Sequence, residues 1–311
     1  MPSISVIIPA YNAEKYIGEA IESALNQTRP AKEIVVVDDA STDRTVKIAR
    51  SFGDRVQVLV NEKNSGPGHS RNAGVAASTG DYLAFLDADD KWLPEHLKDL
   101  AGLLDKWPEA QVAVGAVRTF GCREYVRSYL PQATTPMNVF VPLMRSYGIW
   151  PTATMVRRKC FVAIGGYQDI PEFYKGRRFH PEDTDFILRL AIRFQVVTSS
   201  AVSAMYRRHP EQTTANREHH RLATFKTKMR IIENISALGG DSALGAEASD
   251  RMLREFEQHL KEARITLNLK KLRMFVRWGM KSALLRPACV PYLRSILLPQ
   301  WFLRFRDEMR P

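Results

Sequence analysis

The first hundred residues alternate short runs of β-branched residues with amphipathic segments, and this alternation constrains the fold most strongly. The runs are apolar along nearly their whole length, which is typical of a parallel sheet covered by helices on both faces. The segments between them carry apolar residues at helical spacing. We expect strands at residues 5–8, 33–37, 56–60 and 82–86, and helices at 14–26, 44–51 and 68–77.

The rest of the chain is less periodic at first and then becomes helical. Short strands are predicted at 112–118, 153–156 and 196–199, and one clear helix at 184–193. Beyond Glu211 the pattern predicts helices at 219–238, 244–269 and 272–285. We therefore expect an α/β domain at 1–213 with a Rossmann-like, mostly parallel central sheet, divided into parts at 1–110 and 111–213. A helical extension at 214–311 would follow it.

Composition excludes several classes of protein. Three scattered cysteines among 311 residues exclude a disulfide framework and a cysteine zinc site, and they suit a reducing compartment. The first residues lack the features of a signal peptide, and no uncharged apolar run is long enough to span a membrane. We expect a cytoplasmic protein.

The positive charge is concentrated in the last third of the chain. Residues 217–311 hold 19 Lys and Arg against 10 Asp and Glu, and so carry +9 of the net charge of +11. Basic residues recur there on amphipathic segments that also contain Trp301 and Phe302. This pattern suits the surface of an anionic membrane, and so a peripheral location on the inner face of the cell membrane. A helical hairpin that packs on the first domain or forms an oligomer stays open. Nucleic acid is not expected as a partner, because no binding motif accompanies the charge.

Carboxylates and turn residues follow three of the expected strands. Residues 9–12 follow the first strand, Asp38 and Asp39 the second, and residues 87–90, which include three aspartates, the fourth. Ligands of open parallel sheets bind beyond these strand ends, and gathered carboxylates need a positive charge between them. A divalent cation with its phosphates would supply it. The alternative is that these aspartates only cap helices and form turns.

The glycine-rich stretch at 66–74 precedes a helix. It follows the third strand and has Arg71 where a dinucleotide-binding loop would have its third glycine, so that class of site is excluded. A glycine turn that opens a helix carrying an arginine still suits a phosphate or diphosphate.

Seven segments together resemble the family 2 glycosyltransferases. They are VIIPAYNAE at 6–14, VVVDDASTD at 35–43, GPGHSRNAG at 66–74, DYLAFLDADD at 81–90, FVAIGGYQD at 161–169, PEDTDFILRLA at 181–191 and YRRHPEQTT at 206–214. The resemblance covers about two thirds of the chain in the family's order, and the helical extension lies outside it. It implies the A-type glycosyltransferase fold.

The resemblance also implies roles on the donor side. Pro9, Tyr11 and Asp39 match positions that hold a nucleotide base and ribose, and Arg71 matches a contact to base or diphosphate. Asp87, Ala88 and Asp89 match the Asp-x-Asp motif, whose Mn²⁺ or Mg²⁺ bridges the diphosphate. His209 matches a residue near the metal. For Tyr11 core packing stays open as an alternative, and for His209 a structural role.

On the acceptor side the resemblance makes Asp183 the catalytic base. A single base without a nucleophile implies displacement with inversion. Asp183 could instead only interact with a helix dipole. Trp150, Glu182 and the aromatic, basic segment 170–180 are candidates for acceptor contacts, and for that segment a lid over the donor is equally open.

The expected function is therefore metal-dependent transfer of a sugar from a nucleotide-sugar, with a UDP-sugar favoured, to a hydroxyl of a glycan or lipid-linked acceptor. Polysaccharide, lipopolysaccharide and glycoprotein-sugar assembly in the cell envelope all stay open. The alternatives are a nucleotide-sugar-binding protein with a degenerate site and a sugar nucleotidyltransferase. The latter would need a glycine-rich, basic N-terminal loop, which SVIIPAYN does not offer.

Overall fold

A computed structural model describes residues 1–121, 125–127, 135–145, 151–168, 172–174, 177–179, 181–210, 212 and 217–265. Contacts divide the chain into two compact units, Met1–Gly240 and Asp241–Pro311. The expected boundary near residue 213 stays a prediction.

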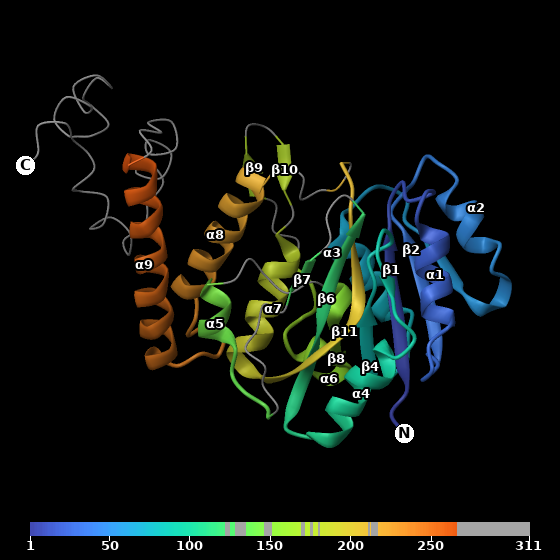
Figure 1. Ribbon diagram of the computed structural model, residues 1–311, viewed down its shortest axis with the longest axis horizontal. Helices are drawn as coiled ribbons and strands as arrows, with labels where there is room; N and C mark the ends of the chain where they lie inside the picture. The colour runs from blue at the N-terminus through green and yellow to red at the C-terminus, as the bar shows by residue number, and fades with distance from the viewer. Residues whose placement is uncertain are drawn as a thin grey trace, which may run out of the picture. The chain divides into compact units, whose positions relative to one another are not determined.

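A mixed sheet of nine strands among the described residues forms the centre of the first unit (Figure 1). Strands β3, β2, β1 and β4 lie side by side and run parallel, and β6 and β11 form a second parallel pair. β8 runs antiparallel between β4 and β6 and so joins the two parallel groups. The strands are β1 (Ile4–Ala10), β2 (Glu33–Asp38), β3 (Gln57–Val60), β4 (Tyr82–Phe85), β5 (Lys91–Trp92), β6 (Ala110–Gly121), β7 (Tyr125–Arg127), β8 (Thr154–Arg157) and β11 (Gln195–Arg208).

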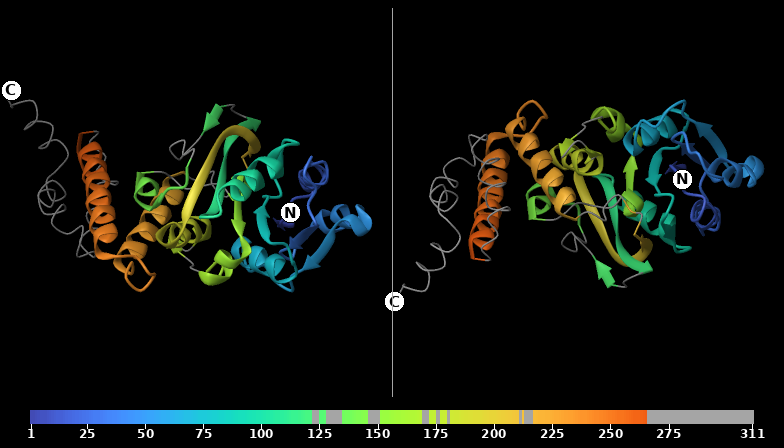
Figure 2. Two further views of the ribbon diagram at one scale, coloured as in Figure 1. Left: turned by 90° about the horizontal axis from the view of Figure 1, so that it is seen from below. Right: turned by 90° about the horizontal axis from the view of Figure 1, so that it is seen from above.

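Helices cover both faces of this sheet (Figure 2). Alternate residues of β1 and β2, such as Val6 and Val36, are in one buried apolar cluster with residues of α1, α2 and α4. On the opposite face, the Phe85 ring lies against Phe161 of α6 and Phe186 of α7. The helices are α1 (Ile17–Leu25), α2 (Thr45–Arg50), α3 (Pro67–Ala76), α4 (His96–Lys106), α5 (Phe140–Arg145), α6 (Arg158–Ala163), α7 (Glu182–Arg193) and α8 (Arg217–Glu233), with 3₁₀ turns η1 (Gly53–Arg55) and η2 (Pro151–Ala153).

The glycine-rich stretch lets α3 lie directly on the sheet. A Cβ atom at Gly74 would come within 2.5 Å of Ile7 Cγ2, so only glycine permits this approach. Gly66 has a φ of 91° and ends the preceding loop at the helix. The helix thereby presents its first turns at the carboxyl edge of the sheet.

The predicted α/β fold with a mostly parallel sheet is confirmed, and the first four strands and three helices lie within a few residues of their predicted positions. Several elements go beyond the prediction. β11 continues nine residues past the predicted strand at 196–199, to Arg208, and α4, α5, α6, β5 and β7 were not predicted. Polar residues such as Ser199 and Ser200 interrupt the apolar pattern of β11, and register shifts absorb them.

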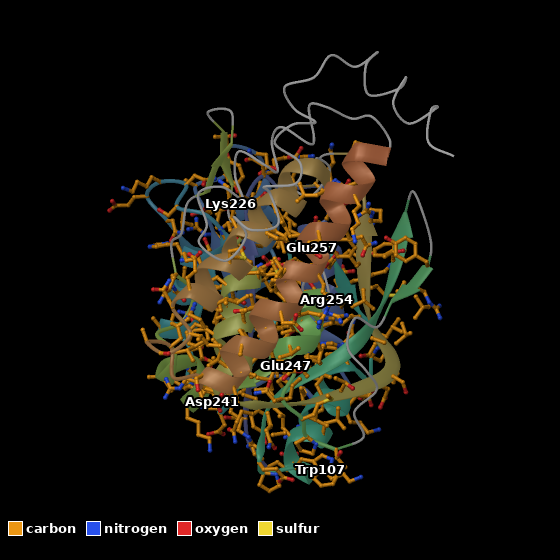
Figure 3. The ribbon with its side chains drawn as sticks, turned by 90° about the vertical axis from the view of Figure 1, so that its left-hand side faces the viewer. Trp107, Lys226, Asp241, Glu247, Arg254 and Glu257 are labelled. Atoms are coloured by element: carbon orange, nitrogen blue, oxygen red, sulfur yellow. The ribbon has the colours of Figure 1, made fainter. Side chains whose placement is uncertain are left out.

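The second unit begins with α9 (Ser242–Ile265), in the region where a helix at 244–269 was predicted. Glu247 and Arg254 are exposed along this helix (Figure 3), and Arg254 forms an ion pair with Asp250 one turn away. The predicted helix at 272–285 and the basic segment around Trp301 lie outside the described residues.

Candidate active site

The carboxyl ends of β2, β1 and β4 meet at one edge of the sheet, as their parallel pairing requires. The Asp39 amide donates to Ala10 O at 2.8 Å, which joins the segments that follow β2 and β1. At this edge Pro9 is buried, whereas Tyr11 is 51% exposed. The exposure of Tyr11 excludes the alternative that its ring packs in the core.

Asp39 organises the loop that leads into α3. Its carboxylate accepts hydrogen bonds from Asn61 Nδ2 at 2.8 Å, from the Ser65 amide at 3.0 Å and from the Gly66 amide at 2.7 Å. The residue is 3% exposed. Asp39 therefore fixes the position of the glycine turn, in addition to its predicted role beside a nucleotide base. Asn61 was not predicted as part of this arrangement.

Arg71 connects Asp87 at the end of β4 with Glu182 at the start of α7. Its guanidinium is 4% exposed and contacts Asp87 Oδ1 at 2.7 Å and Glu182 Oε1 at 2.9 Å. The Tyr167 ring lies beneath it, 5.1 Å from the guanidinium carbon. Burial opposes the charge of Arg71, but the neighbouring carboxylates outweigh burial and raise its pKa. Arg71 is therefore a permanent cation between α3, the end of β4 and the start of α7.

Glu182 is a carboxylate whose second oxygen is unpaired. Its Oε2 atom is buried and has no hydrogen-bond partner among the described residues. Burial and the neighbouring Asp183 raise the pKa of Glu182 to about 7, although Arg71 opposes the shift. The side chain can thus hold a proton near neutral pH, and it faces Arg71 rather than an exposed surface.

Asp87, Ala88, Asp89 and Asp90 form the loop after β4, here called the aspartate loop. Asp89 Oδ2 lies 3.0 Å from His209 Nε2, so the structure brings these two predicted residues together. Burial and then the charge of Asp87 raise the pKa of Asp89, which shows that negative charge is crowded there. Ala88 is buried between the two aspartates.

The donor set of this loop suits a divalent cation that shares its ligands with a diphosphate. Two carboxylates and an imidazole are oxygen and nitrogen donors that Mg²⁺ and Mn²⁺ accept. The buried His209 Nδ1 lacks a hydrogen-bond partner among the described residues, and the crowded charge of Asp89 would be relieved by a cation. Among those same residues no three acidic, histidine or cysteine side chains already surround one point. The residues fit the cation together with its phosphate oxygens.

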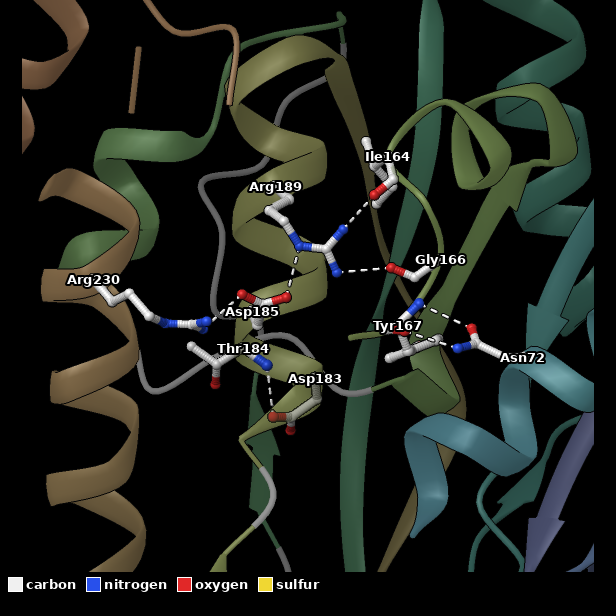
Figure 4. Close-up of polar contacts among 9 residues, drawn as sticks. All are labelled: Asn72, Ile164, Gly166, Tyr167, Asp183, Thr184, Asp185, Arg189 and Arg230. Atoms are coloured by element: carbon white, nitrogen blue, oxygen red, sulfur yellow. Dashed lines mark hydrogen bonds and ion pairs between the residues drawn. The ribbon is translucent and has the colours of Figure 1, made fainter. Parts of the chain in front are cut away.

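The first turn of α7 holds three carboxylates, and their partners differ; Figure 4 shows Asp183 and Asp185 with theirs. Glu182 is paired with Arg71, and Asp185 lies between Arg189 at 2.6 Å and Arg230 of α8 at 2.8 Å. Asp183 Oδ1 accepts a hydrogen bond from the Thr184 amide at 2.6 Å. Within the described residues no guanidinium contacts Asp183, and its side chain is only partly buried.

Further contacts hold α7 in place. The Arg189 guanidinium donates to Ile164 O at 2.6 Å and to Gly166 O at 2.7 Å. Asn72 of α3 exchanges two hydrogen bonds with the Tyr167 backbone, at 2.7 and 2.9 Å (Figure 4). The start of α7 is therefore tied to α3, which carries Arg71. The candidate base and the candidate donor site belong to one connected arrangement.

Some predicted acceptor residues cannot be placed. Trp150 lies outside the described residues, as do residues 170, 171, 175, 176 and 180 of segment 170–180. The described parts of that segment are two short antiparallel strands, β9 (Glu172–Tyr174) and β10 (Arg177–Phe179). The acceptor and lid interpretations both stay open.

Comparison with known proteins finds one matching family model and relatives that are named for polysaccharide biosynthesis. The family model described as glycosyl transferase family 2 matches residues 5–165. The chain is 42% identical over 100 residues to a putative teichuronic acid biosynthesis glycosyltransferase, TuaG, of Bacillus subtilis, which is 31% of this chain and 40% of the relative. It is 37% identical over 147 residues to the succinoglycan biosynthesis protein ExoO of Rhizobium meliloti, 44% of this chain and 41% of the relative. The matched segments thus span about two fifths of these curated relatives.

Solved structures share the fold over most of the chain. The structure of S. aureus TarS 1–349 in complex with UDP-GlcNAc has a TM-score of 0.67 and 20% identity, over 98% of this chain and 88% of that one. A mannosyltransferase from Pyrobaculum calidifontis in complex with GDP-Man and Mn²⁺ has a TM-score of 0.56 and 18% identity, over 94% and 86%. At these identities the likeness concerns the fold.

Proposed function

The chain belongs to glycosyl transferase family 2, and on this premise we propose that it transfers a sugar from a nucleotide-sugar to a hydroxyl group of a glycan or lipid-linked acceptor. One observation carries the proposal. Arg71 joins the aspartate loop to the first turn of α7, where Asp183 is the carboxylate that no guanidinium contacts within the described residues. The edge of the sheet thus combines a place for a diphosphate with a free base.

On the donor side, Asp87, Asp89 and His209 would hold Mn²⁺ or Mg²⁺. The cation would stabilise the negative charge of the departing diphosphate. Arg71 contributes a fixed positive charge at the same place, since its guanidinium is already oriented by Asp87 and Glu182. Pro9, Tyr11 and Asp39 would border the nucleotide base at the ends of β1 and β2. We favour a UDP-sugar, because the TarS fold relatives include complexes with UDP and UDP-GlcNAc.

On the acceptor side, Asp183 would accept the proton of the attacking hydroxyl. The hydroxyl oxygen forms a bond to the anomeric carbon while the bond from that carbon to the diphosphate oxygen breaks. Direct displacement of this kind inverts the anomeric configuration. Arg71 keeps Glu182 engaged, and the two arginines do the same for Asp185. Within the described residues Asp183 is therefore the carboxylate of this turn without a guanidinium partner, and we propose that Trp150 and the unpaired Oε2 atom of Glu182 orient the acceptor.

The C-terminal extension is proposed to bring the enzyme to its acceptor. No helix within the described residues is long and apolar enough to cross a membrane. The excess of basic residues beyond 217 instead suits an anionic membrane surface, where lipid-linked acceptors reside. We also propose that the boundary between the two domains lies at residue 213. The alternative to membrane binding is that the extension forms an oligomer.

Thermal unfolding with Mn²⁺ and a panel of nucleoside diphosphates tests the donor class. We expect a metal-dependent rise in melting temperature with UDP that Asp87→Ala abolishes, because a ligand at about 100 times its Kd stabilises the native state by about 2.7 kcal/mol. The anomeric configuration of the product, read by NMR, tests inversion, and retention would contradict it. Donor binding without turnover in the unmodified protein would favour the degenerate-site alternative.

A further inference from the structure

The end of β11 carries a guanidinium that contacts three separate segments. Arg207 Nε donates to Asp89 O in the aspartate loop at 2.8 Å, and its Nη2 atom pairs with Glu19 of α1. The guanidinium carbon lies 4.7 Å from the Tyr16 ring centroid and 4.4 Å from that of Phe120. The side chain is 16% exposed. Arg207 is thus enclosed between the start of α1, the end of β6 and the aspartate loop.

The backbone of Arg207 is tied to the same loop by a second route. Its amide donates to Asp90 Oδ1 at 2.8 Å, and the other oxygen of Asp90 accepts from Thr152 Oγ1 at 2.7 Å. Thr152 Oγ1 in turn accepts the Asp87 amide at 3.1 Å. Asp90 is fully buried, so these bonds are shielded from water. Both ends of the aspartate loop are therefore held.

His209 lies two residues beyond Arg207 and shares its surroundings. Its ring centroid is 4.9 Å from that of Tyr16, the same ring that flanks the guanidinium, and its Nε2 contacts Asp89. The imidazole and the carboxylate come from segments about 120 residues apart in sequence. Holding such groups in place before a ligand arrives lowers the ordering cost of binding. Arg207 is the residue that contacts both segments and the helix beside them.

We propose that Arg207 is a positioning residue that fixes the aspartate loop against His209 and so preorganises the site for the cation and diphosphate. This inference rests on the proposed function of that site. Asp90 and Thr152 complete the arrangement from the other side of the loop. The Arg207 side chain contacts Asp89, Glu19, Tyr16 and Phe120, so it acts through Asp89 and through the placement of its own strand.

The test compares Arg207→Gln and Arg207→Lys with a matched control, Arg208→Gln. The Arg208 guanidinium lies 6.0 Å from the neighbouring Tyr206 ring and is not one of the partners of the Arg207 side chain, which are Asp89, Glu19, Tyr16 and Phe120, so the control removes an adjacent charge and leaves those contacts in place. Mn²⁺ affinity in the presence of UDP is measured by EPR on the full chain. We expect Arg207→Gln to weaken it by about tenfold or more, which is typical of residues that orient ligands. Arg207→Lys should recover part of this loss, and Arg208→Gln should bind like the unmodified protein.

A readout without ligand separates positioning from stability. Amide hydrogen exchange at Asp89 and Asp90 should accelerate in Arg207→Gln while exchange in β1 and β2 stays unchanged. Unchanged Mn²⁺ affinity in Arg207→Gln, an equal loss in Arg208→Gln, or faster exchange throughout the first unit would each overturn the inference. Failure of the unmodified protein to bind Mn²⁺ and UDP would instead refute the proposed function, and the exchange experiment would still decide the role of Arg207.

Discussion

Asp183 shares the first turn of α7 with two other acidic residues, and guanidinium groups neutralise those two, Glu182 and Asp185. Replacing Asp183 by Asn keeps the shape of the side chain and removes the proposed base. We expect kcat to fall by about 10²- to 10⁴-fold while UDP affinity is unchanged, because the donor residues are untouched. Steady-state kinetics and calorimetry check this. Asp54→Asn, at an exposed carboxylate of η1, is the control. A variant that keeps full turnover would exclude Asp183 as the base.

His96 makes a second prediction, on the pH dependence of stability. It is fully buried, stacks on Trp92, and its Nδ1 lies 2.9 Å from Ser203 Oγ. Burial lowers the pKa of His96 to about 3, whereas an unfolded histidine titrates near 6.5. Between these values the unfolded state binds more protons, so this histidine lowers the free energy of unfolding as pH falls from about 6.5, by up to about 1.4 kcal/mol per pH unit.

Urea unfolding of His96→Asn at pH 7 and pH 5 measures this effect. Glu182 acts in the opposite direction, because its folded pKa of about 7 lies above the ordinary value for a glutamate. The informative quantity is therefore the difference between the variant and the unmodified protein. His96→Asn should lose less stability on acidification than the unmodified protein does. His69→Asn, at an exposed histidine, should lose as much as the unmodified protein. Equal acid sensitivity of all three proteins would contradict the prediction.

At the scale of elements, α7 is held by the buried carboxylate of Asp185, which is 1% exposed between Arg189 and Arg230. Asp185→Asn leaves the buried Arg189 without its counter-charge, so we expect the free energy of unfolding to fall by about 3 kcal/mol. Arg230→Gln should cost less than about 1 kcal/mol, because Arg230 is about one third exposed and its pair is screened. Chemical denaturation compares the two variants, and equal losses would contradict this ranking.

The sequence predicted most of the early elements whose formation depends on local pattern, although it missed α4, whose buried residues also recur at helical spacing. The apolar runs of β1, β2 and β4 and the helix at α3 specify their own structure, and the aspartates after the strands predict a ligand-binding edge, which stays a prediction. Thr152 and Arg207 were not predicted as parts of the site. Their contacts exist because β8 pairs antiparallel with β4 and because β11 continues to Arg208, and both depend on pairing between distant segments.

At the scale of the whole molecule, each described candidate site residue lies in the first unit, Met1–Gly240. A fragment of residues 1–240 should therefore bind UDP with the affinity of the full chain, as measured by calorimetry. If the basic extension binds membranes, only the full chain should sediment with vesicles that contain phosphatidylglycerol, and it should do so less at high salt. Sedimentation of the fragment to the same extent would place membrane binding in the first unit.

The path of β11 has a consequence for exchanging parts between related enzymes. Residues 1–90 look like a self-contained donor module, since they include the ends of β1, β2 and β4. However, His209 and Arg207 complete that edge from the far end of the sequence. A chimera that receives a new donor module must inherit residues 206–209 from the same parent. Thr152 and Tyr167 must come from that parent as well, because they contact Asp90 and Arg71 at the same edge although they lie in the intervening stretch.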